Sequence, residues 1–178
     1  MRKVLNILGY FNDEDIAWMT QVGTKQKILP EQYLIKKRER LTSIYLVLDG
    51  MFSVELKSGL SIAKVKSGEV LGEMSFVEED LPSVDVKADK PSSVICIDHE
   101  FMLERFDQVP GFKARFYNAM CLCLSSRLRA VTRQLSNKQE DDLESNDLNV
   151  LDSNIDNATL RRVQIAGERF NRLLSHFS

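Results

Sequence analysis

Few side chains in this sequence have both the type and the spacing that catalysis or metal binding requires. The two histidines, His99 and His176, have no cysteine or carboxylate at ligand spacing; Asp98 adjoins His99, but neighbours in a strand face opposite sides. The acidic run at residues 78–80 has no histidine near it and is typical of a solvated turn. The serines at 125–126 lie within a predicted helix, and no nucleophile has a recognisable base partner. We therefore expect neither a metal site nor an enzyme.

Composition narrows the class of protein further. The 178 residues carry 24 Lys and Arg against 26 Asp and Glu, a net charge of −2, so no basic excess indicates a nucleic-acid ligand. The longest uncharged stretch in the most apolar helix candidate is residues 116–126, whereas a membrane span needs about 20 apolar residues. The three cysteines (96, 121 and 123) lie in apolar surroundings without a CxxC pair, which predicts reduced, buried thiols in a cytoplasmic protein.

The middle of the chain is predicted to be β structure. Between residues 27 and 97, short runs rich in branched and aromatic residues alternate with turn residues. The runs are 33–35, 44–48, 52–56, 62–65, 84–86 and 93–97, and the turns are 49–50, 58–59, 67–68 and 90–91. Many short strands without long helices between them favour a β-sandwich or barrel. We place N-terminal helices at residues 1–25, with Asn12 or Asp13 as a helix N-cap, and the β domain at 26–98.

After residue 98 the apolar period changes to three and four residues, which predicts helix. The apolar positions are Phe112, Phe116, Ala119, Met120, Cys123, Leu124, Leu128, Val131 and Leu135. They describe one long amphipathic helix within residues 99–136, beginning at Pro110-Gly111 and carrying five basic residues without an acidic one. Residues 137–159 carry a net charge of −6 and are predicted to be an acidic linker, and a second basic helix follows at 160–178.

One segment of the β domain carries a family resemblance. Residues 68–76, Gly-Glu-Val-Leu-Gly-Glu-Met-Ser-Phe, stand seven positions before Ser-Val-Asp-Val-Lys-Ala at 83–88, and this arrangement resembles the phosphate-binding cassette of cyclic nucleotide-binding domains. The upstream run 44–50, Ile-Tyr-Leu-Val-Leu-Asp-Gly, is similar to that family's second signature, a strand that ends in a turn glycine. The resemblance covers roughly residues 12–135. It implies a mainly β fold with flanking helices: a β-roll (jelly roll) followed by a long C-terminal helix.

The resemblance also implies a ligand site in the cassette at residues 68–88. The residues concerned are Val70, Leu71, Gly72, Glu73, Met74, Pro82, Ser83 and Val84. A short helix beginning at about Gly72 is expected to direct free backbone N–H groups at an anionic phosphate. In the family, a glutamate at the position of Glu73 accepts a hydrogen bond from the ribose 2′-hydroxyl, and an arginine after the cassette helix pairs with the cyclic phosphate.

The sequence departs from this pattern at Pro82, which stands where the arginine is expected. Proline has neither a guanidinium nor an N–H, although Ser83 keeps a hydroxyl donor at the next position. Leaving a partly buried phosphate unpaired costs about 2–5 kcal/mol, which weakens affinity by about 30-fold to several thousand-fold. We therefore expect cyclic nucleotide binding to be weak or absent, and no bound cofactor.

Other cations are not expected to replace this arginine. Lys87 shares a strand face with Asp85, so a carboxylate lies between it and the supposed phosphate. Lys36, Lys37, Arg38 and Arg40 belong to another strand and turn, where a solvated loop is the simpler interpretation.

The long helix is similar to the family's C-helix, which makes the dimer in the bacterial catabolite activator group. We accordingly predict a homodimer through the apolar face Phe112, Phe116, Met120, Cys123, Leu124, Leu128 and Val131. The helix at 160–178 is a candidate for contact with the dimer or with a protein partner. About 43 residues follow Leu135, too few for the winged helix-turn-helix of that group, so we do not expect DNA binding by this chain alone.

Three functions remain open at this point. The first is a non-enzymatic bacterial regulatory module with a degenerate cassette, acting through dimerisation and protein interaction. The second is a genuine sensor of a cyclic nucleotide or another small anion, with a rewired phosphate contact. The third is a transcription-associated protein that binds DNA through its Arg-rich helices.

Overall fold

The computed structural model describes residues 7–140 and 157–177, with side chains described for residues 7–132 and 161–177. Parts of two predicted segments, residues 1–6 and most of the acidic linker, lie outside the described residues. The strands are β1 Thr24–Ile28, β2 Tyr33–Ile35, β3 Ser43–Asp49, β4 Met51–Glu55, β5 Ser61–Lys66, β6 Val70–Leu71, β7 Asp85–Ala88 and β8 Ser92–Asp98. The helices are η1 Leu8–Tyr10, α1 Asp13–Val22, α2 Glu73–Glu78, α3 His99–Gln108, α4 Phe112–Glu140 and α5 Asn157–His176.

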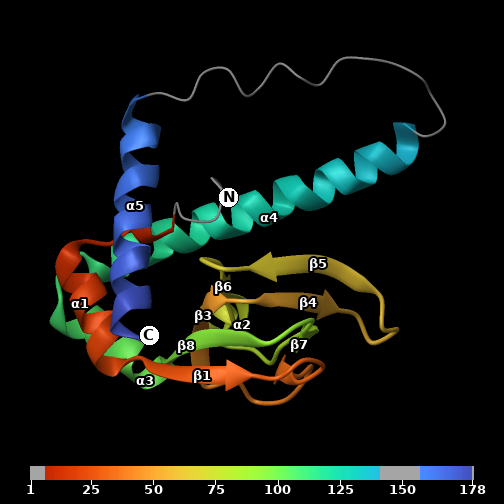
Figure 1. The fold of residues 1–178 in the computed structure, drawn as a ribbon, viewed down its shortest axis with the longest axis horizontal. Coiled ribbons are helices and arrows are strands. Elements are labelled where there is room, and N and C mark those ends of the chain that lie inside the picture. Colours follow the sequence, from red (N-terminus) through yellow and green to blue (C-terminus); the bar gives the residue numbers. More distant parts are fainter. Residues whose placement is uncertain (1–6, 141–156, 178) are drawn as a thin grey trace.

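Within the described ranges, the strands form two antiparallel four-stranded sheets, ordered β1-β8-β3-β6 and β2-β7-β4-β5 (Figure 1). The predicted β-roll with flanking helices is confirmed. Turn glycines make the tight connections possible: Gly50 joins β3 to β4 at a φ of +113°, a conformation that side chains with a Cβ rarely adopt. Short strands bounded by such turns were the basis of the prediction.

Helix α1 begins where the sequence predicts. The Asn12 side chain accepts a hydrogen bond from the Asp15 N–H at 2.8 Å, and the Asp15 carboxylate accepts from the Asn12 N–H at 3.0 Å. This reciprocal capping box satisfies two backbone donors that the first turn would otherwise leave free.

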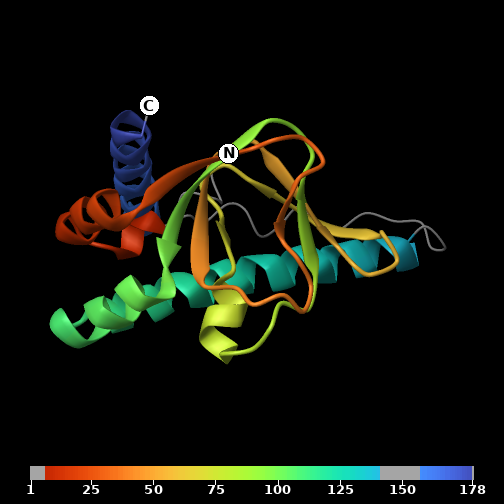
Figure 2. The ribbon, with the colours of Figure 1, turned by 90° about the horizontal axis from the view of Figure 1, so that it is seen from below.

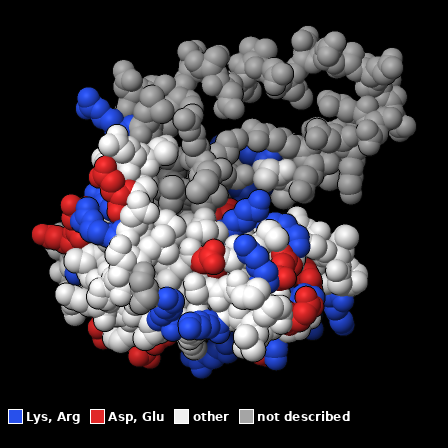
Figure 3. Space-filling view, viewed as in Figure 1, with Lys and Arg blue, Asp and Glu red and all other residues white. Residues whose placement is uncertain are grey.

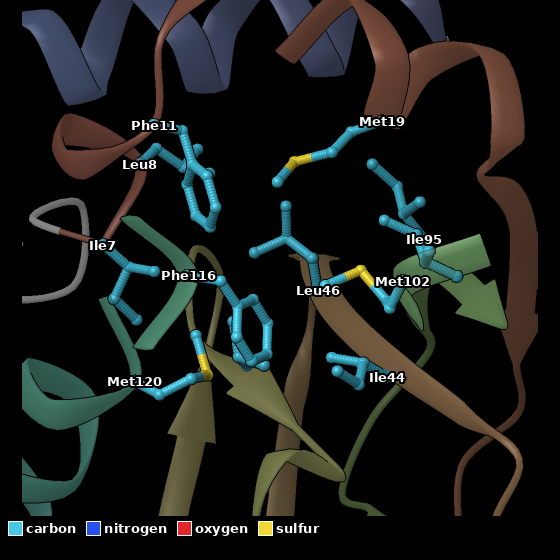
Figure 4. Close-up of a pocket in the computed structure, with 12 residues that line it drawn as sticks. Ile7, Leu8, Phe11, Met19, Ile44, Leu46, Ile95, Met102, Phe116 and Met120 are labelled. Carbon is cyan, nitrogen blue, oxygen red and sulfur yellow. The ribbon is translucent and has the colours of Figure 1, made fainter. Parts of the chain in front are cut away.

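The apolar side chains form two cores. One lies between the two sheets and includes Val47, Phe52, Leu71 and Val86. The other lies between the β1-β8-β3-β6 sheet and the helices. That second core contains a small apolar cavity of about 40 Å³, which is lined by residues of η1, α1, α3, α4 and the sheet (Figure 4).

The long helix begins just after Pro110-Gly111, as predicted, but the region 99–136 also contains a separate helix that was not predicted. Helix α3 ends at Gln108, and α4 begins at Phe112 after Gly111, whose φ is +79°. Helix α4 then continues to Glu140, past the predicted boundary at residue 136, because residues 138–140 (Lys-Gln-Glu) are all good helix formers. Figure 2 shows α4 running along one side of the whole β-roll.

Helix α5 packs on the N-terminal part of its own chain. Its apolar residues Ala166, Phe170 and Leu173 are buried against η1 and α1. Arg169 donates to two backbone carbonyls of η1, at 3.1 and 3.4 Å, and to the Asp13 carboxylate at 3.0 Å. The face that the sequence offers to a dimer or a partner is therefore covered within the monomer. No described helix is long and apolar enough to cross a membrane.

Candidate functional site

The cassette turn lies between β6 and α2 and requires glycine at position 72. Gly72 has a φ of +85° and stands between the end of β6 at Leu71 and Glu73, the first residue of α2. A Cβ placed on Gly72 would lie 2.9 Å from both the Leu41 Cδ2 atom and the Ser43 carbonyl oxygen. A side chain here would therefore be strained and would collide with the segment that leads into β3.

Glu73 is almost completely buried, with 1% of its surface exposed, and it forms an ion pair with Arg127 of α4. The Arg127 Nη1 group donates to the Glu73 carboxylate, and its Nη2 group donates to the Val70 carbonyl. The Arg127 side chain is 27% exposed. The Arg127 guanidinium of α4 thus contacts both Glu73, the first residue of α2, and strand β6, which precedes it.

The electrostatics of this pair are asymmetric. Burial raises the pKa of Glu73 above its ordinary value, and the Arg127 charge and hydrogen bond offset part of that rise. Glu73 also lies close enough to Cys123 to raise the pKa of that thiol, although burial is the main reason that the Cys123 pKa reaches about 11. A buried carboxylate with one guanidinium partner depends strongly on that partner.

The remaining cassette residues are distributed between core and surface. Val70 and Leu71 are buried in the two cores, so a ligand contact from them would have to use backbone atoms. Met74 is exposed on α2. Helix α2 is short, with only six residues.

The second half of the cassette faces a different element. Pro82 is buried, Ser83 is exposed and Val84 is half-buried. The Pro82 carbonyl accepts a hydrogen bond of 2.9 Å from the Arg38 N–H. Lys87 pairs with Glu31 at 2.9 Å and with Glu55 at 3.5 Å, so two carboxylates already engage its charge.

The predicted dimer face of α4 requires a correction. Phe112, Phe116, Met120 and Cys123 are buried in the core of their own chain, so they are not a free surface. The reason is that the first half of α4 lies on the sheet and on η1, α1 and α3. Leu124 is half-buried, whereas Leu128 and Val131 are 68% and 43% exposed, so only the later part of the predicted face is accessible.

The cysteines also differ from expectation at one position. Cys96 and Cys123 are buried as predicted, but Cys121 is exposed on α4. Across residues 7–132 and 161–177, no group of three His, Cys, Asp or Glu side chains is arranged to hold a metal ion.

Sequence reasoning missed Arg127. Its position carried a usable signal, because Arg127 follows Phe116, Met120 and Cys123 at helical spacing and so lies on the buried face of α4. A cation on an apolar helix face requires a buried partner, and Glu73 provides it.

Comparison with known proteins agrees with this geometry. Residues 25–108 match the cyclic nucleotide-binding domain family. Glutaminase 2 of Bradyrhizobium diazoefficiens is 30% identical over 92 residues, which are 52% of this chain and 14% of the relative, so the chain spans about one seventh of that protein.

Two solved structures share the fold at low sequence identity. The c-di-GMP-responsive global regulator CLP of Xanthomonas campestris has a TM-score of 0.61 and 18% identity, over 92% of each chain. A cyclic nucleotide-binding domain from Methylobacillus flagellatus KT has a TM-score of 0.60 and 18% identity, over 82% of this chain and 85% of that one.

Proposed function

Because residues 25–108 of this chain form a domain of the cyclic nucleotide-binding family, we propose that the protein is a non-enzymatic regulatory module whose cassette is held by its own helix α4. In this proposal a cyclic nucleotide binds weakly or not at all. The observation that carries the proposal is the contact of Arg127 with Glu73 and Val70.

Both ligand contacts that the family resemblance implies are altered in this chain. The glutamate that is expected to accept from a ribose hydroxyl already accepts from Arg127. The arginine that is expected to pair with the cyclic phosphate is replaced by Pro82, whose carbonyl accepts from a neighbouring loop. An incoming cyclic nucleotide would have to share or displace the Glu73 partner and would find no guanidinium at position 82.

The same ion pair connects the cassette to α4. Glu73 begins α2, and Arg127 lies between the buried half of α4 and its exposed distal part. A change at Glu73 therefore acts directly on the helix that carries Leu128 and Val131. We assign the output of the module to this distal part of α4, as a dimer contact between two copies.

The test is a calorimetric titration with cyclic AMP, cyclic GMP and cyclic di-GMP up to millimolar concentration. Wild type is expected to give dissociation constants weaker than about 1 mM, for want of the phosphate anchor. The variant Pro82→Arg restores that anchor and is expected to bind at least one of the cyclic mononucleotides about 30-fold more tightly. Pro91→Arg adds the same charge at an exposed turn outside the cassette and serves as the control for added charge.

Two results would overturn the proposal. Micromolar binding of a cyclic nucleotide by wild type would make the protein a conventional sensor with a rewired phosphate contact. Equal gains from Pro82→Arg and Pro91→Arg would show that added charge, not the cassette position, controls the affinity.

A further inference from the structure

The loop between β2 and β3 is the most basic short segment of the described chain. Residues 36–40 are Lys-Lys-Arg-Glu-Arg, with four cations and one carboxylate. Arg38 has a φ of +63°, and Arg38 and Arg40 are exposed. In Figure 3, Lys and Arg atoms are prominent along the lower edge of the β-roll, where Figure 1 shows the orange loops that follow β1.

Hydrogen bonds hold this loop against the second half of the cassette. The Arg38 N–H donates to the Pro82 carbonyl at 2.9 Å, and the Lys37 N–H donates to the Asp85 Oδ1 atom at 2.7 Å. The chain then passes Leu41, which borders Gly72 in the first half of the cassette. The basic loop is thus fixed at the position where the family arginine is missing, instead of extending freely into solvent.

The carboxylates around this loop do not cancel its charge. Glu73 is neutralised by Arg127. Asp85 accepts from a backbone N–H of the loop and keeps its own negative charge, and Glu39 pairs with Lys36 at 3.5 Å, where both side chains are more than half exposed. The four cations of the loop therefore exceed these two carboxylates by two. Lys37, Arg38 and Arg40 have no ion pair within the described part of the chain. Ser83, which is exposed beside Pro82, adds a hydroxyl donor.

We infer that loop 36–40, together with the facing segment 82–85, binds a small phosphate-containing anion with two or more negative charges, such as a triphosphate group. Exposed charge pairs contribute only about 0–1 kcal/mol each, so a singly charged cyclic phosphate gains little from this loop. An anion that contacts several cations together adds these small terms. The inference goes beyond the proposed function, which concerns cyclic nucleotides and α4.

The experiment is calorimetry with inorganic triphosphate and, separately, ATP at low ionic strength. The triple variant Lys37→Gln/Arg38→Gln/Arg40→Gln is expected to weaken triphosphate binding by about tenfold or more. The matched control Lys57→Gln/Lys66→Gln/Lys90→Gln removes the same charge from exposed positions elsewhere and is expected to change it by less than about twofold. Amide chemical shifts of wild type are expected to move at residues 36–40 and 82–85 when triphosphate is added.

Three outcomes would overturn the inference. They are no triphosphate binding by wild type, equal loss in the two triple variants, and binding of duplex DNA without binding of triphosphate. None of them affects the proposed function, which is tested by the titration with cyclic nucleotides and by the oligomeric state of the α4 variants. Tighter binding of ATP than of triphosphate would support the site and add a base contact to it.

Discussion

Helix α4 makes two buried acid–arginine contacts that differ in kind. Near its start, Arg115 binds Asp15 of α1 through two hydrogen bonds of 2.6 and 3.0 Å. Twelve residues later, about 18 Å along the helix, Arg127 binds Glu73 of the cassette. Asp15 and Glu73 are 0% and 1% exposed, so burial alone does not distinguish them.

The difference lies in how many donors surround each carboxylate. Asp15 also accepts from the Asn12 N–H and from Arg105 at 3.4 Å, and these groups outweigh the effect of burial, so the pKa of Asp15 is lowered. Around Glu73 burial has the larger effect, and the pKa is raised. We therefore expect the first contact to persist to lower pH, and the second to depend more strongly on the protonation of its acid.

The two pKa directions have opposite consequences for stability. Because the folded-state pKa of Asp15 is lowered, its contribution is complete above the ordinary value of 3.8 and is lost as pH falls through the lowered pKa. Because the folded-state pKa of Glu73 is raised, stability falls as pH rises from the ordinary value of 4.5 through the raised pKa. Above pH 4.5, the pH dependence of these two groups should therefore come mainly from Glu73.

The largest effect is expected from Asp15→Asn. The substitution leaves Arg105 and Arg115 without their carboxylate between α1, α3 and α4, and it weakens the capping box. We expect the free energy of unfolding to fall by about 3 kcal/mol, as measured by chemical denaturation at pH 7.

Asp13→Asn is the control for this prediction. Asp13 lies on the same helix turn and pairs with Arg169 and Arg172, but its side chain is 63% exposed. A loss of about 0–1 kcal/mol is expected. If the two variants lose equal stability, Asp15 is not the anchor of α4.

A smaller, pH-dependent effect is expected from Arg127→Met. Removing the guanidinium leaves Glu73 buried without its cation, so the pKa of Glu73 rises further. We expect a loss of about 2 kcal/mol at pH 8, less than for a fully buried pair because Arg127 is partly exposed. The loss should be smaller at pH 5, because a raised pKa favours proton uptake by Glu73 as pH falls. Denaturation curves at the two pH values measure the difference.

The double variant Glu73→Gln/Arg127→Met separates this effect from lost packing. It removes both charges and should recover most of the stability at pH 8 and abolish the pH dependence. Arg129→Met, on an exposed part of the same helix, is the control and should change little. A pH-independent loss in Arg127→Met would show that Glu73 stays ionised without its partner.

The comparison of these two contacts also shows how much of the structure could be predicted from the sequence. The helix N-cap at Asn12 was predicted from local sequence, and six of the eight strands match the predicted runs. Strands β1 and β6 were not predicted, because Thr-Lys-Gln-Lys-Ile is mostly polar and Val70–Leu71 is only two residues long. The Glu73–Arg127 pair joins residues 54 positions apart, and no local rule selects that partner. Likewise, the spacing of Phe112 and Phe116 predicts an apolar helix face, but it does not say whether that face meets its own sheet or a second copy.

Substitutions in the distal part of α4 are expected to have the smallest effect on the free energy of unfolding and a large effect on dimerisation. Leu128 and Val131 are exposed on the helix face beyond Arg127. The variant Leu128→Glu/Val131→Glu should change the free energy of unfolding of the monomer by no more than about 0.5 kcal/mol, since it removes little burial. It should nevertheless prevent dimerisation, because two acidic side chains from each copy would face one another.

Sedimentation equilibrium over a dilution series measures this effect, with Ala130→Glu as the control on a different face of the same helix turn. Wild type and the control are expected to dimerise, and the double variant is expected to remain monomeric at every concentration. A monomeric wild type, or a double variant that dimerises as wild type does, would remove the dimer contact from α4. A monomeric wild type would mean that the Arg127 contact has no effect on assembly. A double variant that dimerises would mean that the dimer contact lies on another face of the molecule.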